Sequence, residues 1–323
     1  MIRPADYVRF LMEEYLHDFV RDGGAAVKFV VPLDGADTEE VHFPLREAAA
    51  KEDFVVAHVD GRTTKLHMMD RIFHDIARQV DWDGLAGVVA GSVLRDFGFA
   101  TDGPDGMDLE RIAERHDRGY NLLRIQFSGQ LETEVLKDYD MAQDFRLAMH
   151  WLALAQVDPA QAAQARRLAL LDWLRGDLKR ISELRNALIF QKIARNNARH
   201  MLFSLTRWVR KAGKKGLVLL LDIRQLAVAR RQDAGEGLHY TKAAVLDAYE
   251  VLRQLIDGTD ELGACLVVVS CAPEFLSDPV RGLESYHALR DRVADDVRDR
   301  ARTNPFSALV RVSRTAEPRG GRP

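Results

Sequence analysis

The segment from Val31 to Glu39 follows an apolar run and precedes a helix-like pattern, which is where α/β proteins bind phosphate. It has the sequence VPLDGADTE. A phosphate-binding loop of the form GxxxxGK(S/T) uses glycines for close backbone approach, a lysine for the β- and γ-phosphates and a hydroxyl for Mg²⁺. In this register Pro32 and Asp37 replace the two glycines, Thr38 replaces the lysine and Glu39 replaces the hydroxyl. The segment has the position of such a loop without its chemistry.

Negative charge accumulates at the same place. The loop and the residue after it contain four carboxylates, those of Asp34, Asp37, Glu39 and Glu40. The first lysine after the loop is Lys51. Repulsion is therefore expected to oppose triphosphate binding. If a nucleotide does bind, Gly35 and Thr38 are the loop residues expected to lie against it.

A second candidate position lies at the end of the apolar run from Leu217 to Leu221, which is followed by Asp222 and Ile223. In ATPases such a strand ends in Asp-Glu, where the aspartate serves Mg²⁺ and the glutamate orients the attacking water. Here the aspartate is present and isoleucine replaces the glutamate. A structural alternative is that Asp222 caps the segment that follows it.

Positive charge is concentrated between residues 166 and 215, where fourteen basic side chains oppose three acidic ones. A helix is predicted over residues 186–212, and on it Lys192, Arg195 and Arg199 recur at intervals of three and four. The basic face continues with Arg207, Arg210, Lys211 and Lys214. Such a face could bind DNA phosphates, with an affinity that falls steeply with salt. The alternative is a solvated face or one that docks on acidic parts of the same chain.

The elements that would position these residues follow from apolar periodicity. The predicted strands are residues 26–31, 54–59, 216–221, 264–270 and 309–312. The predicted helices are residues 4–21, 38–50, 66–80, 85–97, 109–117, 141–157, 160–174, 186–212 and 243–256. A strand-helix-strand unit this short predicts parallel strands with a right-handed crossover. We expect an α/β fold in four parts: residues 1–64 and 214–313 form the sheet domain, 65–213 a helical insertion and 314–323 a disordered tail.

Bulk properties exclude several classes of protein. The formal charge of −3 excludes a uniformly basic nucleic-acid coat. The two cysteines, Cys265 and Cys271, indicate buried thiols in a reducing compartment. No run of about 18 apolar residues occurs, so we expect a cytoplasmic protein without a membrane segment. Neither a metal-ligand cluster nor a nucleophile motif is found, and we expect no catalytic or metal-binding residues.

The chain resembles the BREX-type ATP-binding proteins, which are P-loop proteins of bacterial phage-defence systems. The resemblance extends from about residue 17 to residue 312. It rests on residues 23–31 (GGAAVKFVV), 54–60 (FVVAHVD), 216–222 (GLVLLLD), 272–276 (APEFL), 278–283 (DPVRGL) and 285–292 (SYHALRDR). It implies a P-loop NTPase-like, AAA-like parallel sheet with a large helical insertion. It also places Ser270 nearest the γ-phosphate position and makes Arg290 or Arg292 a charge that reaches a neighbouring subunit.

Members of this family normally carry the lysine and threonine in the loop and Asp-Glu after the second strand, and this chain departs at both places. The first hypothesis is therefore a pseudo-ATPase that acts as a scaffold or adaptor for a defence helicase, nuclease or ATPase subunit. DNA and a second copy of the chain are further candidate partners under it. No cofactor is expected under it. The alternative is an ATPase or nucleotide sensor that uses ATP and Mg²⁺ through an atypical loop.

Overall fold

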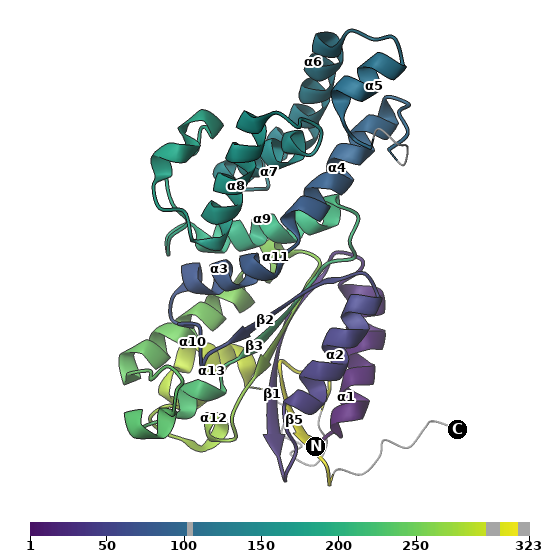
Figure 1. Ribbon diagram of the computed structural model, residues 1–323. Coiled ribbons are helices and arrows are strands. Elements are labelled where there is room, and N and C mark those ends of the chain that lie inside the picture. The colour runs from purple at the N-terminus through teal and green to yellow at the C-terminus, as the bar shows by residue number, and fades with distance from the viewer. Residues whose placement is uncertain (102–105, 295–303, 316–323) are drawn as a thin grey trace, which may run out of the picture. The chain divides into compact units, whose positions relative to one another are not determined.

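The computed structural model describes residues 1–101, 106–294 and 304–315 (Figure 1). The chain divides into two compact units, described separately below: Met1–Gln79 with Lys214–Pro323, and Val80–Gly213. Helix α3 (Met69–Gln79) therefore belongs to the first unit, although the helical insertion was expected to begin at residue 65. Of the expected disordered tail, Arg314 and Thr315 are described, and residues 316–323 lie outside the described residues.

A five-stranded sheet forms the centre of the first unit, with the order β2-β3-β4-β1-β5. Every neighbouring pair of strands is parallel. The strands are β1 (Ala25–Leu33), β2 (Val55–Asp60), β3 (Leu217–Asp222), β4 (Cys265–Ser270) and β5 (Leu309–Ser313). Every residue of β3 and β4 is buried, as expected for strands covered on both faces. The predicted α/β fold with a parallel sheet is confirmed.

Strand β1 continues through Pro32, where the sequence suggested that it would end. The N–H of Phe29 donates to Ala308 on the β5 side, whereas Val30 faces β4 and accepts from Cys271 N–H. Because successive residues of a strand bond to opposite neighbours, the backbone of Pro32 faces β4, as that of Val30 does. The last residue pair between β1 and β4 is Val30 with Ser270, two residues before Pro32. The N–H that proline lacks would have no partner in β4, so the strand tolerates it.

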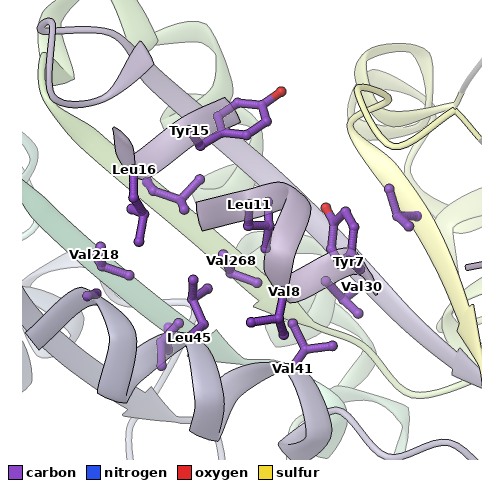
Figure 2. Packing of buried hydrophobic residues seen from close by; sticks show 14 of the residues in the cluster. Tyr7, Val8, Leu11, Tyr15, Leu16, Val30, Val41, Leu45, Val218 and Val268 are labelled. Carbon is purple, nitrogen blue, oxygen red and sulfur yellow. The ribbon is translucent and has the colours of Figure 1, made fainter. Parts of the chain in front are cut away.

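One face of the sheet is covered by α1 (Pro4–Phe10), its π-helical continuation η1 (Leu11–Phe19) and α2 (Glu39–Lys51). Figure 2 shows Leu11, Leu16 and Leu45 meeting the strand residues Val218 and Val268. The apolar side chains of Tyr7, Leu11, Tyr15 and Leu16 thus form one buried helix face, whereas Phe19 is 48% exposed. This core fixes the helix that directly follows the candidate phosphate loop.

The opposite face is covered by helices that follow β3 and β4 (Figure 1). They are α10 (Lys242–Asp257), α11 (Thr259–Leu262), α12 (Glu274–Ser277) and α13 (His287–Val293), with short 3-10 turns η4 (Arg224–Ala227), η5 (Arg231–Ala234) and η6 (Leu283–Ser285). Phe275 of α12 stacks on Phe29 of β1 with ring centroids 5.9 Å apart. Helix α3 packs against the edge strand β2.

The described residues of the second unit form helices and their connecting loops, and no strand. It contains α4 (Trp82–Asp96), α5 (Leu109–Arg115), α6 (Tyr120–Leu131), η2 (Glu132–Leu136), α7 (Gln143–Ala155), α8 (Gln161–Arg175), η3 (Ile181–Ala187) and α9 (Ala198–Lys211). Helix α6 was not predicted, because its apolar face is narrow: only Leu123, Phe127 and Leu131 are buried on it. Among all the described residues of the chain, no helix is long and apolar enough to cross a bilayer.

The prediction of one helix over residues 186–212 was wrong in its first half. A 3-10 helix ends at Ala187, residues 188–197 are irregular, and the α-helix begins at Ala198. Leu188 adopts the left-handed conformation with φ 61°. Asn197 also bonds the local backbone through its side chain, accepting from Ala194 N–H at 2.8 Å and donating to Lys192 O at 3.2 Å. Such side-chain bonds compete with helical ones.

Candidate functional site

The carboxyl ends of the central strands bring the predicted nucleotide residues to one edge of the sheet. In the strand register Asp222 pairs with Ser270, and Ser270 pairs in turn with Val30 of β1. Parallel α/β sheets bind ligands at this edge, because the loops that follow the strands converge there. The structure therefore places Asp222 and Ser270 together, beside the loop that follows β1.

The loop after β1 satisfies its own backbone donors at the start of α2. The Asp37 carboxylate accepts from Glu39 N–H at 3.1 Å, and the Glu40 carboxylate accepts from Asp37 N–H at 2.8 Å. This reciprocal pair is a capping box that uses aspartate. In a phosphate-binding loop such N–H groups would point at the ligand. Here carboxylates of the chain take the position that an anion would occupy.

The Arg224 guanidinium links this loop to the end of β3. Its Nε lies 3.0 and 3.1 Å from the two Asp222 oxygens, and its Nη2 lies 2.6 Å from Oδ2. The same group reaches Asp37 at 3.2 Å and Glu39 at 3.3 Å. Hydrogen bonding to Asp222 raises the pKa of Arg224, and the hydrogen bond from Glu39 N–H, aided by the charge of Arg224, lowers the pKa of Asp37. One cation thus bridges three carboxylates at the edge of the sheet.

The Ser270 hydroxyl is bound to His42 of α2, with its Oγ 2.6 Å from His42 Nε2. Both side chains are buried. Burial and the nearby His58, whose ring centroid is 6.0 Å away, lower the pKa of His42 to about 4. His42 is therefore neutral at pH 7, and the position expected to face a γ-phosphate is filled by a neutral imidazole.

The remaining chemistry at this edge is limited. Thr38 is fully buried and Asp222 is 5% exposed. Burial raises the pKa of the neighbouring Cys271 thiol well above its usual range, which disfavours the nucleophilic thiolate. No group of three or more His, Cys, Asp or Glu residues in the described ranges is placed to hold a metal ion. The arrangement is a closed network of ion pairs and hydrogen bonds.

The other predicted nucleotide residues lie as follows. Gly35 has φ 76° at the tip of the loop, with open space where a side chain would begin. Arg290 lies on α13 and pairs with Glu284 and Asp291, each at 3.0 Å. Sequence reasoning missed Arg224 and His42. Arg224 follows Asp222 by two residues and donates its backbone N–H to that carboxylate at 2.9 Å, so an Asx turn at the strand end was the available signal.

Several of the predicted DNA-binding cations are engaged within the chain. Arg207 pairs with Asp140 at 2.8 Å and Lys211 with Asp138 at 3.5 Å. Lys214, in the sheet unit, pairs with Asp53 at 2.6 Å. The Lys192 ammonium donates to two backbone carbonyls, and the Arg199 guanidinium lies 5.9 Å from the centroid of the Phe203 ring.

The predicted stripe of Lys192, Arg195 and Arg199 is not formed on one helix, because Lys192 and Arg195 precede α9. Arg195 and Arg210 also take part in interactions within the chain. Arg210 lies on α9 and is exposed, as is Arg195.

Comparison with protein families gives one match: the model of the BREX system ATP-binding protein BrxC/D covers residues 11–315. The chain belongs to this family. The sheet is accordingly that of a P-loop NTPase-like fold, in which Asp222 ends β3. No curated protein and no solved structure matches the chain.

The buried His42 imidazole makes stability depend on pH. The folded pKa of about 4 lies below the ordinary value of 6.5, so the unfolded chain binds the proton more tightly. This contribution is complete above pH 6.5 and is lost as the pH falls toward 4. We expect the stability difference between wild type and His42→Gln to shrink by about 3 kcal/mol between pH 7 and pH 4. Urea titrations at both pH values measure it, and an unchanged difference would exclude a neutral, buried His42.

Proposed function

We propose that this chain is a non-catalytic, pseudo-ATPase subunit that acts by binding other components of a phage-defence system. One observation carries the proposal: the Arg224 guanidinium joins Asp222 to Asp37 and Glu39. Asp222 is the residue that would serve Mg²⁺, and the other two flank the phosphate position. An internal cation therefore pairs with the carboxylate that would hold Mg²⁺, while Asp37 and Glu39 place negative charge where a triphosphate would lie.

Three further features support the same proposal. The loop has no lysine for the phosphates, the Asp37 carboxylate accepts from Glu39 N–H, and the Glu40 carboxylate accepts from Asp37 N–H. Thr38, which stands in the lysine position, is buried. Ile223 replaces the glutamate that would orient water. Binding a nucleotide would require the capping box and the Arg224 bridge to open together, and each is stable without a ligand.

Family membership supports the defence setting, since the matching family is described as belonging to the BREX system. A binding subunit needs a folded surface and a partner, and it needs neither hydrolysis nor a cofactor. The helical unit, which lies outside the sheet, offers such a surface. Contact with DNA is not part of this proposal, because Arg207 and Lys211 are paired with Asp140 and Asp138.

The competing function is an ATPase or nucleotide sensor in which Asp222 holds Mg²⁺ and Arg290 of another subunit reaches the phosphates. Calorimetric titration of ATP with Mg²⁺ separates the two. The proposal predicts no saturable binding when ATP is present at about 1 mM. A ligand with a Kd of about 1 mM has a binding free energy of only about 4 kcal/mol, so this concentration also detects weak binding. Binding that Asp222→Asn abolishes would establish the competing function.

A further inference from the structure

Residues 177–197 of the helical unit form a rigid surface segment between α8 and α9. Leu178, Leu184, Ala187, Ile189 and Ile193 are buried and anchor it. Two indoles hold its backbone: Trp151 Nε1 donates to Ala187 O at 3.3 Å, and Trp173 Nε1 donates to Gln191 O at 2.9 Å. These bonds fix the chain on both sides of residues 188–190. The segment is irregular in backbone and well anchored in position.

Two large apolar side chains on this segment face solvent. Leu188 is 59% exposed and Phe190 is 65% exposed, while Ile189 between them is fully buried. Leu188 also holds a left-handed backbone conformation, which is uncommon for a residue with a side chain. The two side chains line an open hollow of about 500 Å³ together with Leu147, Gln143, Gln191 and Asp144, whose carboxylate accepts from Gln191 Nε2 at 2.7 Å. Exposed anchors beside a hollow are typical of interface centres.

Cations flank the apolar pair in the sequence of the segment. The segment contains two acidic residues and five exposed basic residues, which are Lys179, Arg180, Arg185, Lys192 and Arg195. Arg180 pairs with Glu183 at 3.7 Å, and Lys192 donates to the carbonyls of Leu178 and Lys179. Arg185 has no ion-pair partner in the described part of the chain. These five side chains, called the basic rim below, give the segment a net positive charge.

We infer that the segment 177–197 is a docking surface for a partner protein that presents an apolar side chain flanked by carboxylates. The apolar side chain fills the hollow between Leu188 and Phe190, and the carboxylates meet the basic rim. A DNA backbone would use the rim and leave Leu188 without a partner, so a protein fits the surface better. Because Trp151 and Trp173 hold the segment in place, little ordering is needed on binding. The inference rests on the proposed binding function and assigns it a surface.

The test uses the full-length chain and each other purified protein of its defence system, titrated singly by biolayer interferometry. The docking variant replaces Leu188→Ser and Phe190→Ser together. The control variant replaces Ile125→Ser and Leu168→Ser, which are 70% and 55% exposed elsewhere in the helical unit. We expect one protein to bind, the docking variant to weaken its binding by about 30-fold or more, and the control variant to leave it unchanged. The wild-type affinity should also fall as salt rises.

Each other outcome has a distinct meaning. A complex that tolerates the docking variant as well as the control overturns this surface and leaves the proposed function standing. If no protein binds, both fail. If the wild type instead binds a 30-base-pair duplex and the docking variant alone loses it, the partner is a nucleic acid and the inference is wrong. Circular dichroism of both variants establishes that they are folded.

Discussion

Replacing Arg224→Ala is expected to destabilise the protein by about 2–3 kcal/mol. The substitution leaves the buried Asp222 carboxylate without its guanidinium and removes the cation shared with Asp37 and Glu39. Loss of one partner from a buried pair costs about 3–5 kcal/mol, and solvent reduces that cost here because the Arg224 side chain is 36% exposed. Chemical denaturation with guanidinium chloride measures the change as a shift in midpoint.

Two comparisons give this result its meaning. Arg290→Ala removes another arginine with two carboxylate partners, but these carboxylates are 61% and 62% exposed whereas that of Asp222 is buried, so stability should change little. Pairing Arg224→Met with Asp222→Asn removes both charges and should recover most of the loss. If Arg224→Ala behaves like Arg290→Ala, the guanidinium does not hold the edge of the sheet together, and the main support for a pseudo-ATPase is lost.

Replacing Leu45→Ala is expected to cost about 2–5 kcal/mol, which is the largest effect foreseen for a single residue here. Leu45 is fully buried between α2 and the sheet, in the cluster that contains Val218 and Val268 (Figure 2). Its loss leaves a cavity beneath the helix that follows the candidate loop. Thermal or chemical unfolding of the purified variant measures the effect.

The matched control lies on the same helix. Phe43 is 51% exposed and has the Arg46 guanidinium 5.3 Å from its ring centroid, so Phe43→Ala should cost less than about 1 kcal/mol. ATP with Mg²⁺ should leave the unfolding temperature of Leu45→Ala unchanged, because a ligand stabilises only a fold that binds it. A clear rise in that temperature would show that nucleotide binding contributes to the stability of α2.

The strands were predictable because the central ones are continuous apolar runs, which the burial of β3 and β4 explains. The parallel arrangement followed from the short crossover between the first two strands. The helix predicted over residues 186–212 began too early because its start was placed by apolar periodicity alone. The left-handed Leu188 and the local bonds of Asn197 depend on tertiary packing that periodicity does not report.

At the candidate site, the sequence located the loop, Asp222 and Ser270, since strand ends define that edge of a parallel sheet. It did not reveal that Arg224 and His42 bond to these residues in place of a ligand. The bridge from Arg224 to Asp37 joins residues 187 positions apart, and the bond between Ser270 and His42 spans 228 positions. Local patterns carry no signal for such pairs. In the sequence, the residues that replace the phosphate-binding groups appear only as losses. In the structure, they form a closed network of ion pairs and hydrogen bonds.

Titration of ATP with Mg²⁺ into the full-length protein by calorimetry tests the central claim most directly. Wild type, Asp222→Asn and Arg224→Ala should each show no saturable heat at about 1 mM nucleotide, because the capping box of Asp37 and Glu40 persists in all three. Saturable binding by wild type that disappears in Asp222→Asn would contradict the account and identify an ATP-binding site that uses Mg²⁺.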